Sequence, residues 1–304
     1  MSVASNLAYM LALLAVGVAG RRAGVFTPTR RDRLTDLAFL VALPALVYTA
    51  TFDQSLGEVL SARLVAGVVG VIFFGLVGAW AVHRHRPDAA TRSVAVVQSY
   101  HTNLGFLGLP VVAATFGAGA VEAGKASVVL GVGALVQVPA TVVVLSAVND
   151  ADASLSGELG SLARNPVLLA LGAGLGSAAV GWSPPSLAVA GLSALASLAL
   201  PVALVAVGGS LSLESTTVDR ATVGAVAGVK LLAMPVVAFG VFSLLGAAPA
   251  TVRTGVVMFA MPTAVSTFVY ASALGGDPDL ASFNVFVTTA VSVATLGPVL
   301  WLFG

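Results

Sequence analysis

The chain has 304 residues, of which 58% are hydrophobic and 9% are charged, and its mean hydropathy is +1.02. A soluble domain carries about 25% charged residues, and the strands of a membrane β-barrel alternate apolar with polar residues, so both classes are excluded. The net charge of +1 excludes a nucleic-acid-binding surface, and the absence of cysteine excludes disulfides and cysteine-ligated zinc. The composition predicts an all-α integral membrane protein.

Apolar stretches of membrane-spanning length follow one another along the chain. A helix needs roughly 20 residues to cross the hydrocarbon layer, so there is room for about ten spans. The stretches lie at about 4–20, 34–52, 59–82, 93–116, 120–148, 166–181, 185–211, 221–246, 251–275 and 279–303. We therefore expect a multi-pass protein of the cell membrane with ten transmembrane helices in the lipid bilayer.

The basic residues predict the orientation of these spans. The first stretch is followed by Arg21 and Arg22 and has no basic residue before it, the reverse of a secretory signal. With the N-terminus outside, the even-numbered connections receive Arg63, Lys125 and Arg253. The odd-numbered, cytoplasmic connections receive Arg21, Arg22, Arg30, Arg31, Arg33, Arg84, Arg86, Arg92, Arg164 and Arg220. The positive-inside rule therefore predicts that both termini lie outside.

The two halves of the chain resemble each other. LAFLVALPALV (37–47) is similar to LASLALPVALV (195–205), and GLPVV around Pro110 is similar to AMPTAV around Pro262. Residues 1–148 and 166–304 each hold five stretches, so the second copy must be inverted, and the polar segment 149–165 reads as a cytoplasmic linker. Inverted repeats are typical of secondary transporters, whose substrate site lies at the repeat interface.

The fourth and ninth stretches carry the strongest candidate site. In the fourth, Asn103 follows other polar residues and precedes Pro110, and in the ninth Pro262 is followed by Thr263 and Ser266. Proline removes a helix hydrogen bond, and freed backbone groups are tolerated only against protein or a watery cavity. Two broken helices would bring half-helix starts together as an anion pocket. Freed carbonyls could instead hold a cation, and ordinary kinked helices are the structural alternative, which we favour for Pro44 and Pro201.

Four other polar residues are further candidates for substrate contact or coupling. Lys230 in the eighth stretch attracts an anionic substrate or extends to the membrane surface. His101 couples proton movement to transport or is a satisfied hydrogen-bonding residue. Tyr100 and Gln137 contact substrate or join helices by hydrogen bonds. The centres of the predicted spans hold no carboxylate, which argues against a cation/proton antiporter.

Several segments resemble the auxin efflux carrier family of membrane transporters. They are NLGFLGLPVV (103–112), MPTAVSTFVYASALGGD (261–277), KLLAMPVV (230–237) and LALPVALVAVGGSL (198–211), and the resemblance extends over essentially the whole chain. It implies ten spans in two inverted five-helix repeats, with broken fourth and ninth helices that cross at the prolines. It also implies a scaffold part, often dimeric, and a mobile transport part. Asn103 matches the family's asparagine seven residues before the proline, whereas many microbial members have asparagine where this chain has Ser266.

The sequence therefore predicts a secondary transporter of a small organic anion, such as a carboxylate or an auxin-like weak acid, working by alternating access. It predicts a homodimer, proton or sodium coupling as options, and neither a cofactor nor a bound metal. One alternative is a sodium-coupled symporter that resembles the bile-acid symporters, and another is a passive anion uniporter or channel. An enzyme is not expected, because the sequence offers no catalytic set such as HExxH.

Overall fold

The computed structural model describes residues 3–210 and 219–304, and Leu211, the last residue of the seventh predicted stretch, lies outside them. The described residues form helices and their connections, apart from one isolated β-bridge. Five helical segments are long and apolar enough to cross a membrane: Leu56–His83, Val121–Asn149, Ser186–Ser210, Arg220–Leu244 and Pro278–Phe303. The chain is thus a helical membrane protein, whereas the number of crossings stays a prediction.

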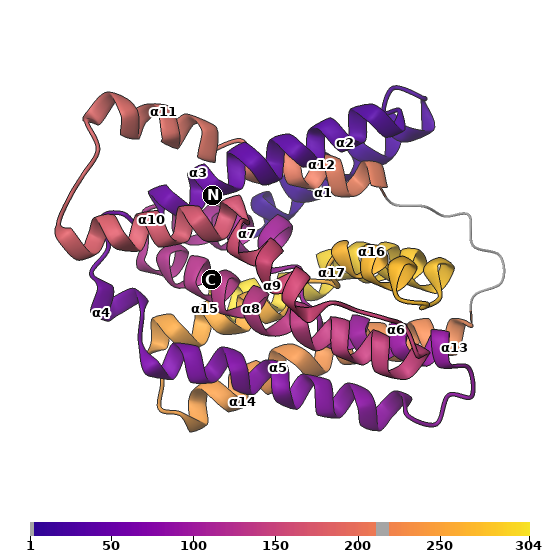
Figure 1. Ribbon diagram of the computed structural model, residues 1–304. Helices are drawn as coiled ribbons and strands as arrows, with labels where there is room; N and C mark the ends of the chain where they lie inside the picture. Colours follow the sequence, from indigo (N-terminus) through magenta and orange to yellow (C-terminus); the bar gives the residue numbers. More distant parts are fainter. Residues whose placement is uncertain (1–2, 211–218) are drawn as a thin grey trace.

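The helices pack in two groups, which Figure 1 shows in the upper part and in the middle and lower parts of the view. In the first group α1 packs on α12, and α3 packs on α10 and α11. This first group consists of α1 (Val3–Arg22), α2 (Pro28–Leu37), η1 (Ala38–Ala42), α3 (Leu43–Thr49), α10 (Pro166–Val180), α11 (Ser186–Ala196) and α12 (Ala199–Ser210). Both halves of the chain therefore contribute to it.

In the second group α5 packs against α14, and α8 packs against α5, α6, α7 and α15. It consists of α5 (Ala62–His83), α6 (Ala89–Tyr100), η2 (Leu104–Gly108), α7 (Leu109–Phe116), α8 (Val121–Asn149), α13 (Arg220–Gly228), η3 (Val229–Ala233), α14 (Met234–Leu244), α15 (Pro249–Phe259), α16 (Ser266–Ala273) and α17 (Pro278–Phe303). The short helices α4 (Leu56–Val59) and α9 (Leu155–Ala163) lie in connections.

Three prolines are accommodated by π-helical turns. The turns η1, η2 and η3 each end two residues before a proline, which is Pro44, Pro110 or Pro235. In η2 the N–H of Leu109 donates to the carbonyl of Leu104, five residues back. This wider turn lets the helix continue past a residue that has no N–H to donate. The chain therefore stays helical through Pro110.

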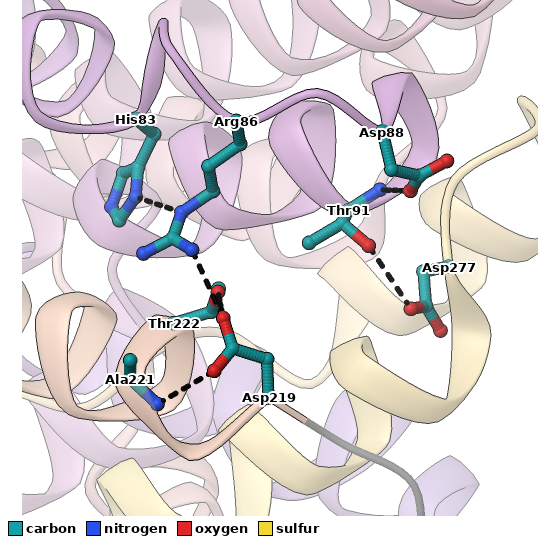
Figure 2. Close-up of polar contacts among 8 residues, drawn as sticks. All are labelled: His83, Arg86, Asp88, Thr91, Asp219, Ala221, Thr222 and Asp277. Carbon is teal, nitrogen blue, oxygen red and sulfur yellow. Dashed lines mark hydrogen bonds and ion pairs between the residues drawn. The ribbon is translucent and has the colours of Figure 1, made fainter.

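One end of the molecule is held together by polar contacts among three connections (Figure 2). Arg86, between α5 and α6, forms an ion pair of 3.2 Å with Asp219, which precedes α13. The Thr91 hydroxyl donates to Asp277, which precedes α17, at 3.4 Å, and Asp88 accepts the N–H of Thr91. These three connections are odd-numbered in the predicted topology, so they share one end as alternating spans require.

Even-numbered connections meet in a second set of contacts. Arg63 donates to the carbonyl of Gly246 at 2.9 Å, and Lys125 donates to that of Glu58. Arg253 forms an ion pair with Glu122 and stacks on the ring of Phe116. All three basic residues assigned to even-numbered connections therefore take part in contacts between such connections.

Glycine brings α1 and α12 into backbone contact. A Cβ atom on Gly208 would lie 2.3 Å from the carbonyl oxygen of Leu14, and one on Gly17 would lie 2.4 Å from that of Val205. Only glycine fits at such distances, because real Cβ atoms do not approach backbone atoms so closely. This contact fixes the first and seventh predicted spans against each other.

Candidate functional site

Both segments that carry the candidate site are interrupted, and the two interruptions pair with each other. Thr102 and Thr263 form an antiparallel β-bridge. The N–H of Asn103 donates to the carbonyl of Pro262 at 2.9 Å, and the N–H of Ala264 donates to that of His101 at 3.1 Å. Helix ends leave backbone groups without partners, and such groups are costly in hydrocarbon. The bridge satisfies several of them, so each interruption stabilises the other.

The place of the first interruption differs from the expectation that the helices cross at prolines. Pro262 lies at the crossing, between α15 and α16. Pro110 instead lies within α7, seven residues after Asn103, because the π-helical turn η2 absorbs its missing N–H. The fourth segment is broken at 101–103, where the helix α6 has ended and η2 begins.

Two helix starts adjoin the crossing. Asn103 caps the helical run through η2 and α7, because its Oδ1 accepts the N–H of Phe106 at 3.1 Å. The helix α16 starts at Ser266, three residues after the bridge. Each helix start carries about half a positive charge. The ends of α6 and α15 carry the opposite partial charge at the same crossing, so the positive potential is confined to the two helix starts.

Lys230 adds a buried amino group behind the crossing. Its Nζ donates to Oγ1 of Thr102 at 2.9 Å and to the carbonyl of Phe259, the last residue of α15, at 3.1 Å. The side chain is 0% exposed, so the alternative that Lys230 reaches the membrane surface is wrong in this structure. The ion pairs found among the described residues, Arg86–Asp219 and Arg253–Glu122, do not include it. A cation is favourable at a helix C-terminus, so α15 helps to hold the ammonium group.

The helix α8 supports the first interruption from one side. Oε1 of Gln137 accepts the N–H of Thr102 at 2.8 Å. One turn further, the hydroxyl of Thr141 contacts Nδ1 of His101 at 2.7 Å and the hydroxyl of Tyr100 at 2.9 Å. Gln137 and Tyr100 thus join helices, which was the alternative to substrate contact. Thr141 was missed in the sequence, because a lone threonine in an apolar helix carries no signal.

A second network supports the other interruption. The Thr263 hydroxyl donates to the backbone carbonyl of Gln98. The Gln98 side chain donates to Oγ1 of Thr267 at 2.9 Å and accepts from Nδ2 of Asn284 at 2.8 Å. Thr267 and Asn284 were also missed, since nothing in the sequence links them to residue 98. The polar cluster of the fourth segment therefore holds the ninth segment and α17 in place.

A cavity of about 300 Å³ lies beside the crossing. Polar residues from both interrupted segments and α8 line it, together with apolar side chains such as Phe106 and Leu130. Asn103 is 3% exposed, and its Nδ2 is a buried donor with no partner among the residues that the structure describes. This cavity thus combines apolar walls, two helix starts and one unused hydrogen-bond donor, which suit a carboxylate with an apolar body, with one opposing carboxylate, that of Glu158.

The structure brings together some of the candidate residues and separates others. Asn103, His101, Gln137 and Ser266 line this cavity. Tyr100, Pro262, Thr263 and Lys230 lie outside its lining and support it through the contacts described above. Pro110 lines a separate cavity of about 390 Å³, together with Phe52, Gly119 and Pro201. Within residues 3–210 and 219–304, no group of three or more metal-ligating side chains is found.

Comparisons with known proteins indicate the family of the chain. The family described as "Membrane transport protein" matches residues 5–156 and 153–300. A protein named "Putative malonate transporter", from Rhizobium meliloti (strain 1021), is 34% identical over 142 residues, which cover 46% of this chain and 44% of that protein. The chain is therefore aligned with less than half the length of this relative. The chain therefore belongs to the membrane transport protein family, as its resemblance to auxin efflux carriers indicated.

Proposed function

We propose that the chain is a secondary transporter of small organic anions, which binds the substrate carboxylate in the cavity beside Asn103 and works by alternating access. The observation that carries the proposal is the Nδ2 group of Asn103, which is buried at the cavity and unpartnered. A buried donor without a partner is costly, and a carboxylate oxygen would satisfy it. Lys230 and the two helix starts supply the opposite charge.

A dicarboxylate such as malonate is the first substrate to test, because the relative from Rhizobium meliloti is named for malonate. A buried lysine and a preorganised donor favour a carboxylate, and the apolar walls suit a short carbon chain. Auxin-like weak acids share the carboxylate and are the second class to test.

Alternating access is supported by the arrangement of the helices. The first and second predicted spans pack with the sixth and seventh, and the remaining six form the other group. We propose that the first group is the scaffold and that the second carries the substrate. The pairing between the two halves is symmetric. The first span of one half packs on the second span of the other, because α1 packs on α12 and α3 packs on α10. Two inverted repeats, 1–148 and 166–304, would produce this pairing. Contacts within odd-numbered and within even-numbered connections support ten crossings.

We place the dimer interface on the scaffold group and both chain ends outside the cell. The helices α10 and α11 carry strongly exposed apolar side chains, among them Val180 at 77% and Leu187 at 85%. A second copy or lipid would cover them. The excess of arginine at odd-numbered connections supports a cytoplasmic position for that end.

Sodium-coupled symport is a second candidate, and the helix α17 favours it. Oδ1 of Asn284 and Oγ1 of Thr289 are buried oxygen atoms without a partner in the described part of the chain. Neutral oxygen ligands suit a hard cation. Sodium would then bind beside Gln98, whose side chain contacts Asn284.

A thermal-shift screen of the purified protein tests the proposal. Carboxylic acids including malonate are added with and without sodium and at two pH values, and a ligand at 100 times its Kd stabilises the fold by about 2.7 kcal/mol. We expect malonate or a related carboxylate to raise the melting temperature of the wild type by several degrees. Asn103→Asp should lose this shift, because aspartate keeps the helix cap but replaces the donor with a negative charge. A shift of equal size in the variant would contradict the site.

A further inference from the structure

The linker between the two halves of the chain contributes to the wall of the cavity. Its helix α9 starts at the cap Ser154, whose Oγ accepts the N–H of Gly157 at 3.1 Å, and it packs on α8 and α10. Glu158, Ser161, Leu162 and Asn165 all line the cavity beside the crossing. The first three have the spacing of one helix face, and Asn165 is the N-cap of α10, two residues after α9 has ended. The linker is thus packed against the cavity rather than extended away from it.

Glu158 is the one carboxylate among the described residues that line this cavity. Its carboxylate lies near the hydroxyl of Tyr270 and interacts with it electrostatically, and Tyr270 lies on α16 and lines the same cavity. The contact therefore joins the linker helix to the half-helix that starts at the crossing. Glu158 is half-buried, so its charge faces both the cavity and the solvent.

The charge of Glu158 opposes that of the rest of the cavity. Lys230 and the helix starts attract an anion to Asn103, whereas an ionised Glu158 repels it. A unit charge at the mouth of a narrow cavity is weakly screened, so it changes the local concentration of an anion by about threefold to tenfold. An anion can approach Asn103 from this side most readily when Glu158 has moved away from Tyr270.

We propose that Glu158 is an anion gate that determines which charges enter the cavity. While Glu158 holds Tyr270, the cavity is closed to anions on the linker side. Movement of α9 separates the two residues and opens the path. The inference deepens the proposed function, since it assigns the control of substrate entry to a residue outside the spans.

The absence of cysteine from the chain allows a direct test. Ala134→Cys and, separately, Ser266→Cys place one thiol in the cavity wall. The rate of modification is measured in proteoliposomes with two methanethiosulfonate reagents of similar size, one with a negative sulfonate and one with a positive trimethylammonium group. Each cysteine variant is combined with Glu158→Gln or with the control Asp152→Asn. Asp152 is an exposed linker carboxylate that does not line the cavity.

We expect Glu158→Gln to speed the negative reagent about threefold to tenfold and to slow the positive one, while Asp152→Asn changes neither. Tyr270→Phe should increase the rate of modification by both reagents, because it removes the contact that holds α9 but keeps the negative charge of Glu158. The proposal would be overturned if the ratio of the rates for the negative and the positive reagent were the same with Glu158 and with Glu158→Gln. It would also be overturned if the thiols reacted with neither reagent in both backgrounds. The reagents need no substrate, so a failed thermal-shift screen would contradict the proposed function without altering this result.

Discussion

Nζ of Lys230 donates a hydrogen bond of 2.9 Å to Oγ1 of Thr102, in the middle of the first interruption. The same amino group donates to the carbonyl of Phe259, where α15 ends before the second interruption. One fully buried amino group therefore joins both broken segments at their crossing.

Replacing Lys230 with methionine tests the role of this amino group. Lys230→Met keeps the length of the side chain and removes both hydrogen bonds, so we expect malonate binding to weaken at least tenfold. The variant should still fold, although the Thr102 hydroxyl and the carbonyl of Phe259 lose their donor, which we expect to cost about 1–3 kcal/mol of unfolding free energy. Isothermal titration of the purified variant, after gel filtration to verify a monodisperse protein, measures this change. An unaltered Kd would show that Lys230 supports the fold alone.

Gln137 allows its structural role to be separated from an electrostatic one. Gln137→Leu leaves the buried N–H of Thr102 without its acceptor, which we expect to cost about 1–3 kcal/mol of unfolding free energy. Gln137→Glu keeps an acceptor and should recover most of that stability, yet its charge in the cavity should abolish anion binding. Denaturation curves and malonate titrations of both variants measure the two effects. Equal stability of the two variants would contradict the assigned hydrogen bond.

The close contact of α1 and α12 predicts an effect of added volume. In Gly208→Ala the new Cβ would meet the carbonyl of Leu14, so the helices must separate, at a cost of about 1–3 kcal/mol. Gly172→Ala in α10 is the matched control, since a Cβ there meets nothing within 4 Å. Thermal unfolding in detergent compares the variants. If both melt at the wild-type temperature, the two helices do not pack as described.

The contacts in Figure 2 predict a dependence of stability on pH. The hydrogen bond from the Thr222 hydroxyl, followed by that from the N–H of Ala221, holds the pKa of Asp219 below its ordinary value of 3.8. The stabilisation is therefore complete above pH 3.8 and is lost as the pH falls through the lower pKa of the folded state.

Asp219→Asn removes this titration while keeping an N-cap residue. We expect the unfolding free energy of the variant to fall less steeply than that of the wild type below pH 4. Unfolding curves over a series of acidic pH values measure the slopes. Parallel slopes would show that Asp219 is not protonated on unfolding in this range.

The positions of the helices could be predicted from the sequence, because long apolar runs leave few other structures in a membrane. The interruptions were also indicated, since polar residues beside glycine and proline are costly in an unbroken apolar helix. The exact position of the first interruption could not be predicted. The sequence indicated a break at Pro110, but a π-helical turn lets the helix continue through this residue. No residue pattern in the sequence indicates such a turn. The paired backbone of Thr102 and Thr263 depends on two segments far apart in the chain.

The cavity was predicted only in part, for a similar reason. Asn103 and Ser266 were identified by their neighbours in sequence, and both line the cavity. Glu158 was missed because it lies in a polar linker, where a carboxylate is ordinary, and only the packing of α9 brings it to the cavity. Thr141 and Asn284 acquire their roles from partners on other helices. Tertiary contacts of this kind cannot be inferred from one sequence.

Counterflow of radiolabelled malonate in proteoliposomes tests the central claim, that a carboxylate binds beside Asn103 and is carried across. Vesicles loaded with unlabelled malonate contain either the wild type or Asn103→Asp. The account predicts saturable, transient accumulation of the label in wild-type vesicles and none above protein-free vesicles in the variant. Accumulation of equal rate and extent in both would contradict it.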